Sequence, residues 1–131
     1  MVIRKENIIV KLTFELALDI VALSEVLEEN RKHVIARQVL KSGTSIGANV
    51  REAQNAESKV DLIHKMKIAL KEADETQYWL DIIQQSKGYP DVTTIKEKVI
   101  SIDKVLTKIV SSSKTANIKP LSNYQIDKLS N

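Results

Sequence analysis

Residues 92–109 read VTTIKEKVISIDKVLTKI, and this stretch decides the fold. Its aliphatic residues recur at alternating intervals of three and four, the spacing of one face of an α-helix. They are Val92, Ile95, Val99, Ile102, Leu106 and Ile109. Lysines occupy the remaining faces, and Thr94 with Glu97 three residues later matches a capping box. The stretch therefore predicts an amphipathic helix over about residues 92–112.

Three segments upstream show the same helical spacing, over about residues 8–29, 32–53 and 59–85. Asn7 is a plausible cap for the first of them, and Ser58, followed by an aspartate three residues on, for the third. The connections between the segments are short, which favours antiparallel neighbours.

The chain has 131 residues, which fits one domain. It contains only three glycines and two prolines, which argues against a turn-rich β architecture. We therefore expect an all-α fold, an antiparallel up-down-up-down four-helix bundle over residues 1–116. Residues 117–131 read as a C-terminal tail that we expect to be flexible.

The composition excludes several classes of function. The chain has no cysteine, which excludes disulfides, thiolate zinc sites and cysteine nucleophiles. The first apolar stretch carries Lys11, Glu15 and Asp19, so it predicts neither a signal peptide nor a membrane span. We expect a cytoplasmic protein without membrane contact. A net charge of +3 permits nucleic-acid binding without demanding it.

The first segment carries more apolar residues than one core requires. One stripe contains Ile9, Leu12, Leu16, Ile20, Leu23 and Leu27, and an adjacent stripe contains Val10, Phe14, Ala17, Val21 and Ser24. A single stripe about 100° wide is enough to face a core. This helix is therefore expected to pack against two surfaces.

Gly43 and Gly47 stand four residues apart within the second segment. Each costs about 1 kcal/mol relative to alanine inside a helix. Close approach of a neighbouring helix, or a pocket for a large side chain such as Trp79, would offset this cost. The alternative is a break near residues 42–44, and we favour the continuous helix.

Four polar residues, Asn49, Glu52, Glu72 and Glu75, could suggest a carboxylate metal site. A di-iron bundle needs two Glu-x-x-His pairs and two further glutamates, and this chain does not repeat such a pair. A structural role is expected instead, with the carboxylates paired to Arg51, Lys71 or Asn49. Because no nucleophile motif or phosphate-binding loop is present either, we expect no catalytic residues, cofactor or metal.

Basic residues run along the second and third segments and could contact nucleic-acid phosphates. They are Arg31, Lys32, Arg37, Lys41, Arg51, Lys59, Lys65, Lys67 and Lys71. On charge alone a solvated face is the more common explanation, because acidic residues are interleaved.

Residues 42–83 closely resemble a bacterial four-helix bundle family whose founding members are encoded in intervening sequences of large-subunit ribosomal RNA genes. The residues that carry the motif here are Gly43, Ser45, Gly47, Asn49, Glu52, His64, Glu72, Glu75, Tyr78 and Trp79. The resemblance extends over roughly residues 6–110.

The resemblance implies a homopentameric ring without established enzymatic activity. The accessory protein of diversity-generating retroelements is similar, and it is a basic pentamer that binds nucleic acid and a reverse transcriptase. Two hypotheses follow. The chain is either a nucleic-acid-associated assembly that contacts RNA or DNA, or a scaffold for an unknown protein partner.

Overall fold

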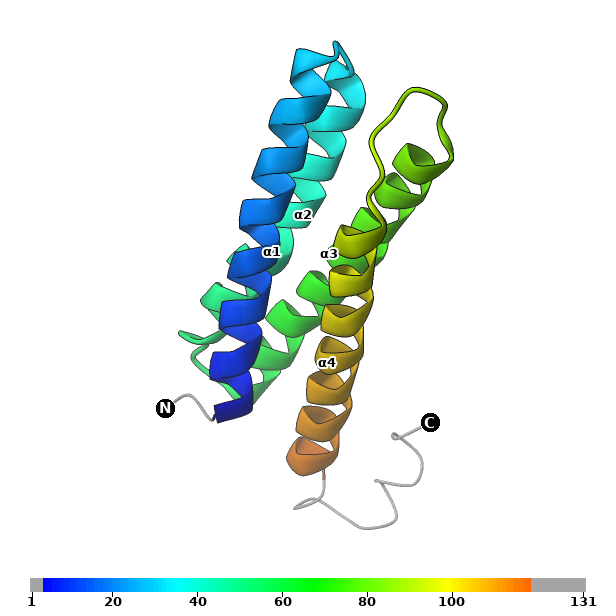
Figure 1. Ribbon diagram of the computed structural model, residues 1–131. Helices are drawn as coiled ribbons and strands as arrows, with labels where there is room; N and C mark the ends of the chain where they lie inside the picture. The colour runs from blue at the N-terminus through cyan, green and yellow to red at the C-terminus, as the bar shows by residue number, and fades with distance from the viewer. Residues whose placement is uncertain (1–3, 119–131) are drawn as a thin grey trace.

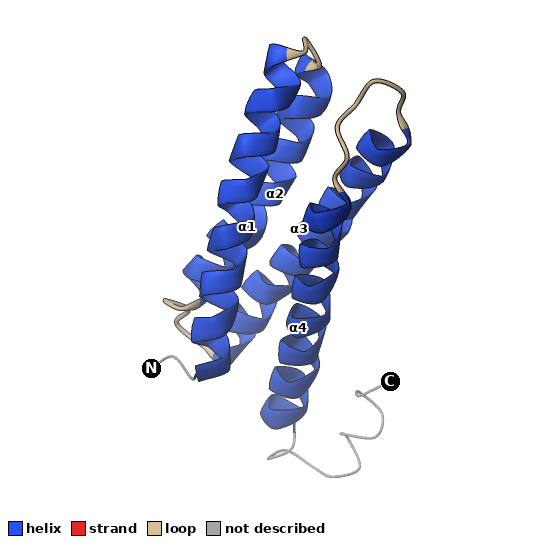
Figure 2. Ribbon diagram, in the orientation of Figure 1, coloured by secondary structure: helices blue, strands red, loops and turns tan. Residues whose placement is uncertain are grey.

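The computed structural model of the protein describes the backbone of residues 4–118 and the side chains of residues 8–112. The backbone forms four helices, α1 (Arg4–Glu29), α2 (His33–Ala53), α3 (Lys59–Gln85) and α4 (Thr93–Ile118). The part of the expected tail that follows Ile118 lies outside the described residues. Within residues 4–118 there is no strand, as Figure 2 shows, and the prediction of an all-α fold is confirmed.

Successive helices run in opposite directions and form a bundle (Figure 1). Each helix packs against the one that precedes it, and α4 closes the bundle by packing more sparsely against α1. An ion pair between Lys98 of α4 and Asp19 of α1 supports this last seam.

The core consists of aliphatic side chains from all four helices. The inner stripe of α1 is almost completely buried, with Leu16, Ile20 and Leu27 fully enclosed. Facing side chains from the other helices include Val39, Ile46, Met66, Leu80, Val99 and Leu106. The helical spacing read from the sequence therefore places the core correctly.

Helix α2 continues without a break through both of its glycines, as predicted. A Cβ atom added at Gly43 would lie 2.8 Å from Ile20 Cγ1, and one added at Gly47 would lie 3.2 Å from the Thr13 carbonyl oxygen. The close neighbour is therefore α1. The expectation that Trp79 fills this space is wrong, because α3 packs on a different face of α2.

The turn between α1 and α2 is tight and depends on an unusual conformation at Arg31. The amide of Arg31 donates to the Glu28 carbonyl at 3.0 Å, and that of Lys32 donates to the Leu27 carbonyl at 2.8 Å. This pair of bonds closes a helix end with a left-handed residue, a place usually taken by glycine. Arg31 adopts φ 63° there.

Two of the three predicted helix caps differ from the structure. Ser58 caps α3 as predicted, and its hydroxyl accepts from the Asp61 amide at 3.0 Å. Helix α4 begins at Thr93 rather than after Thr94, and Asp91 Oδ1 accepts from the Thr93 amide at 3.1 Å. Helix α1 begins at Arg4, so Asn7 lies inside it, because the preceding charged residues also favour helix.

Candidate association surface

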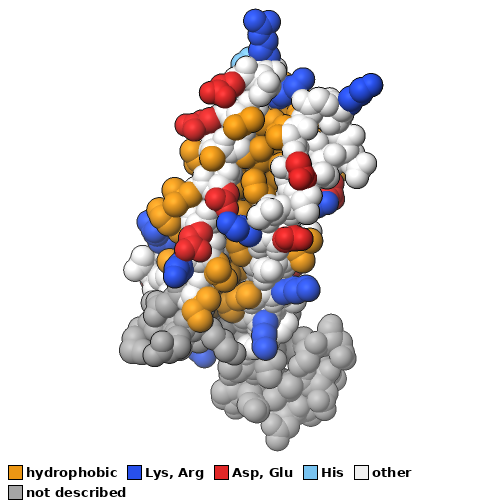
Figure 3. Space-filling model, viewed as in Figure 1, with side chains coloured by type: hydrophobic (Ala, Val, Ile, Leu, Met, Phe, Trp, Pro, Cys, Tyr) orange, Lys and Arg blue, Asp and Glu red, His pale blue; other side chains and the backbone are white. Residues whose placement is uncertain are grey.

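The outward face of α1 carries a row of exposed apolar side chains, which we call the outer strip. It consists of Phe14, Leu18 and Val21, which are 50%, 55% and 40% exposed. Five of the nine large hydrophobic residues that are exposed in the described part of the chain lie on α1. Hydrophobic side chains follow this helix in the space-filling view (Figure 3). Of the second apolar stripe predicted from the sequence, Phe14 and Val21 reach the surface, whereas Ser24 is buried; Leu18 was not part of that prediction.

A groove runs between α1 and α2 beside the outer strip and has a volume of about 390 Å³. The guanidinium of Arg51 lies over the Phe14 ring, 5.6 Å from its centroid. The groove exists because α1 approaches the backbone of α2 at Gly47, where no side chain intervenes. Its walls also include Val10, Ala17, Thr44, Ala48 and Asn55.

The basic residues on the α1–α2 side of the bundle are not equivalent. Arg31 lies in the tight turn, and the Lys32 ammonium lies 4.9 Å from the centre of the Tyr89 ring. Arg37 and Lys41 are exposed on α2. These two therefore remain free to meet another molecule.

The basic residues of α3 also divide into two kinds. Lys65 forms an ion pair with Glu52 of α2 at 2.9 Å, and this hydrogen bond raises the pKa of Lys65. Lys59, Lys67 and Lys71 are exposed.

Register separates exposed basic residues of the two helices. The hydroxyl oxygens of Ser42 and Thr76 are 3.0 Å apart, so Lys41 is level with the middle of α3. Lys67 is two residues from Lys65, which is tied to the end of α2. The structure therefore does not gather the nine predicted basic residues into one patch.

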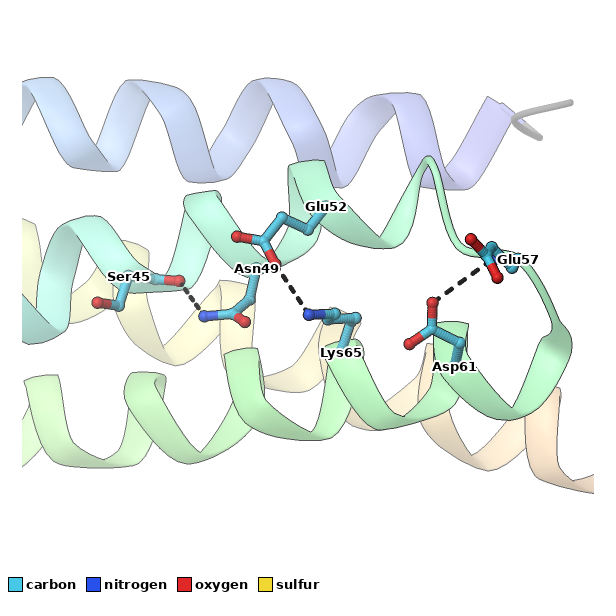
Figure 4. A network of polar contacts seen from close by, with 6 residues as sticks. All are labelled: Ser45, Asn49, Glu52, Glu57, Asp61 and Lys65. Carbon is cyan, nitrogen blue, oxygen red and sulfur yellow. Dashed lines mark hydrogen bonds and ion pairs between the residues drawn. The ribbon is translucent and has the colours of Figure 1, made fainter.

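Among the motif residues of α2, Glu52 links this helix to α3 (Figure 4). Asn49 Nδ2 donates to the Ser45 carbonyl at 2.8 Å, within the helix, and Lys65 Nζ reaches Glu52 across the seam. Beyond them Asp61 Oδ2 accepts from the Glu57 amide at 3.4 Å. Glu52 therefore pairs with Lys65 and not with any of the three partners predicted for it.

The remaining motif residues lie on α3. Trp79 is half-buried, and its Nε1 donates to Glu75 Oε2 at 3.2 Å. The Tyr78 ring meets the Trp79 ring edge-on, with centroids 5.3 Å apart. The Glu72 carbonyl accepts from the Thr76 hydroxyl, and His64 is exposed. No three described His, Asp or Glu side chains stand close enough together to hold a metal ion.

Two polar features of the interior were not predicted from the sequence. One is the buried pair of hydroxyls at Ser42 and Thr76, between α2 and α3. The other is Asp103 of α4, whose pKa is raised to about 6 by partial burial and by the neighbouring Asp74 carboxyl. Gln77 Nε2 donates to Asp103 at 3.1 Å. Of these two features, only Asp103 could have been noticed in the sequence, because this charged residue directly follows Ile102 of the apolar stripe.

The described part of α1 to α4 contains no helix with the length and apolar content needed to cross a membrane.

Comparison with known proteins identifies a family and similar solved structures. The model of a family described as 23S rRNA-intervening sequence protein matches residues 5–108. A crystal structure from Bacteroides thetaiotaomicron, described as a protein of unknown function from the S23 ribosomal protein family, is 40% identical. The similarity covers 81% of this chain and 97% of that one, with a TM-score of 0.76. None of the curated proteins matches this chain.

Proposed function

We propose that this chain, which belongs to the 23S rRNA-intervening sequence protein family, is a non-enzymatic assembly protein whose copies associate through the outer strip. The observation that carries the proposal is the exposure of Phe14, Leu18 and Val21 in a row on one helix. Contiguous exposed apolar side chains mark contact sites, because removing them from water is favourable. A ring of five copies is the assembly that the family resemblance predicts.

A non-enzymatic role fits what this surface offers, namely apolar and charged side chains suited to contact. The groove beside the strip is formed mainly by aliphatic and small residues, with Arg51 at its edge. Such a composition favours packing against another helix over binding a reactive group.

Light scattering of the purified full chain tests the proposal. The expected mass is several times the 14.7 kDa of one chain. Replacing Phe14 with serine should shift the mass toward one copy. Tyr78→Ser is the matched control, because Tyr78 is an aromatic residue that is 60% exposed on α3. An unchanged mass for Phe14→Ser, or an equal loss for both variants, would count against the outer strip.

Nucleic-acid binding is a second candidate function, supported by the exposure of Lys59, Lys67 and Lys71 on α3. These lysines lie on a different helix from the outer strip, so association would leave them accessible. Repetition around a ring would multiply the phosphate contacts, and contacts of this kind are sequence-independent and salt-dependent. The ribosomal family named for the structural neighbour makes RNA the first ligand to test.

A filter-binding titration with RNA at low and moderate salt tests this candidate. Lys67→Gln with Lys71→Gln should weaken binding and reduce its salt dependence. The matched control is Lys104→Gln with Lys108→Gln, an exposed pair with the same spacing on α4. No binding at low salt would reject the candidate.

The alternative role is a scaffold for an unrelated protein, because the outer strip could accept such a partner as well. A pull-down from native extract, with and without nuclease, distinguishes a protein scaffold from nucleic-acid association. A protein retained after nuclease treatment favours the scaffold.

A further inference from the structure

We infer that, in the assembly proposed above, the outer strip of α1 packs against the outward face of α2 of the next copy. This inference rests on the proposed self-association and adds the partner surface, the register and two ion pairs. It follows from the order of charges along the two helices.

The outer strip is bounded by charges of opposite sign. Lys11, Phe14, Leu18, Val21 and Glu25 follow one another at intervals of three and four, so they lie on one face of α1. All five are exposed. Neither Lys11 nor Glu25 has a hydrogen bond or ion pair with another described residue. The face is therefore apolar in the middle, cationic toward the start of α1 and anionic toward its end.

Along the chain, the charges on the outward face of α2 follow the same order as those on α1, cationic first and anionic last. Arg37 and Lys41 are exposed near the start of α2, Ala48 is exposed in the second half, and Glu52 is exposed in the last turn. Because α2 runs antiparallel to α1, its cationic end lies beside the anionic end of the outer strip (Figure 1). The small side chain of Ala48 leaves room for a large apolar residue.

Symmetry fixes the heights at which these faces would meet. A rotation about an axis parallel to the bundle moves nothing along that axis. Each residue of α1 then meets the next copy's α2 at the height where it stands beside its own α2. Those heights are known, since Ile20 stands beside Gly43 and Thr13 beside Gly47.

This register pairs opposite charges at both ends. The Arg37 guanidinium of one copy falls opposite the Glu25 carboxylate of the next. Lys11 likewise falls opposite Glu52, which also accepts from Lys65 within its own copy. Between the two pairs, Phe14 falls opposite Ala48. Since complementary charges fix the register of an interface, both ends favour the same alignment.

The two faces lie on neighbouring corners of the bundle, so successive copies turn relative to one another. Heterologous contacts of this kind close into a ring when the rotation closes. The competing arrangement is a two-fold pair of outer strips, in which Lys11 would meet Glu25 of the partner. That pair would leave Arg37 without a partner of opposite charge, so we favour contact between α1 and α2.

Charge exchange in the full chain separates these arrangements, with mass by light scattering as the readout. Glu25→Arg places two cations opposite each other in either arrangement and should weaken association about tenfold or more. The double variant Glu25→Arg/Arg37→Glu should restore the mass. Glu97→Arg, an exposed glutamate on α4, is the matched control and should leave the mass unchanged.

The outcomes are distinct. Restoration by Arg37→Glu supports the inference. Restoration by Lys11→Glu in its place, or an oligomer that Glu25→Arg does not weaken, overturns the inference and leaves the proposed self-association standing. A wild-type chain of single-copy mass overturns both. Circular dichroism of each variant verifies that the helices form.

Discussion

The two faces of α1 have nearly the same chemistry and opposite surroundings. Leu16 on the inner face is fully buried, whereas Leu18, two residues later on the outer face, is 55% exposed. Burying a leucine side chain contributes about 1.5–3 kcal/mol. The inner face makes this contribution within one chain, and the outer face can make it only when another surface covers it. One helix can therefore serve both folding and association.

The largest expected effect comes from truncating the same residue type on each face. Leu16→Ala should lower the free energy of unfolding by about 2–5 kcal/mol, because it leaves a cavity in the core. Leu18→Ala should change the free energy of unfolding by about 0.5 kcal/mol or less when the protein is dilute. The same variant should reduce the mass of the assembly. Urea unfolding and light scattering measure the two quantities. Equal losses of stability from both variants would erase the distinction between the faces.

The contact between the inner face of α1 and α2 can also be disturbed by substitutions at the glycines of α2. Gly43→Ala places a methyl group 2.8 Å from two carbons of the Ile20 side chain, which cannot move away cheaply. We expect a loss of about 1–3 kcal/mol, despite the better helix propensity of alanine. Gly47→Ala should cost less, since its nearest atom is 3.2 Å away.

A smaller side chain at position 20 tests whether a clash with Ile20 causes the loss of stability expected for Gly43→Ala. In the double variant Gly43→Ala/Ile20→Ala both contacting carbons, Cγ1 and Cγ2, are absent, so the two changes should be less than additive in a thermal melt. Additive costs would show that the clash is not the cause.

Sequence periodicity located all four helices and the inner stripe of α1, because burial on a helix follows its 3.6-residue period. It found Phe14 and Val21 of the outer strip but not Leu18. It could not identify the neighbour of Gly43, since that depends on which helix lies beside which face of α2. Of the two alternatives, close approach of a neighbouring helix is confirmed, and Trp79 does not fill the space. The Glu52–Lys65 ion pair was missed because it depends on the register of the α2–α3 hairpin, not on spacing within one helix.

The turn between α1 and α2 offers a change that should affect folding alone. Arg31 holds a positive φ, which costs a non-glycine residue about 1–2 kcal/mol. Arg31→Gly should therefore raise the free energy of unfolding by up to about 1 kcal/mol, because glycine loses more freedom on folding and so offsets part of the relief. Chemical denaturation measures this gain. The mass should not change, and a smaller assembly would implicate this turn in association.

The smallest expected effect lies on the far side of the bundle, at Asp103. Its folded-state pKa is raised from the usual 3.8 to about 6, so the folded protein binds the proton more tightly than the unfolded chain does. The stability it contributes is complete below about pH 3.8 and is lost as the pH rises through about 6.

Replacing Asp103 with asparagine removes this titration. The difference in unfolding free energy between the wild type and the variant should therefore move in favour of the wild type as the pH falls from about 7 to about 4. Urea titrations across this range measure it. A difference that is constant with pH would contradict the assigned cause, and the mass should be the same for both proteins.

Sedimentation equilibrium of the wild-type full chain over a dilution series is the decisive test of self-association through the outer strip. Self-association through the outer strip should give a mass several times 14.7 kDa that falls toward one copy on dilution or stays at a fixed multiple. A mass of one chain at every concentration would mean that the outer strip of α1 does not join copies.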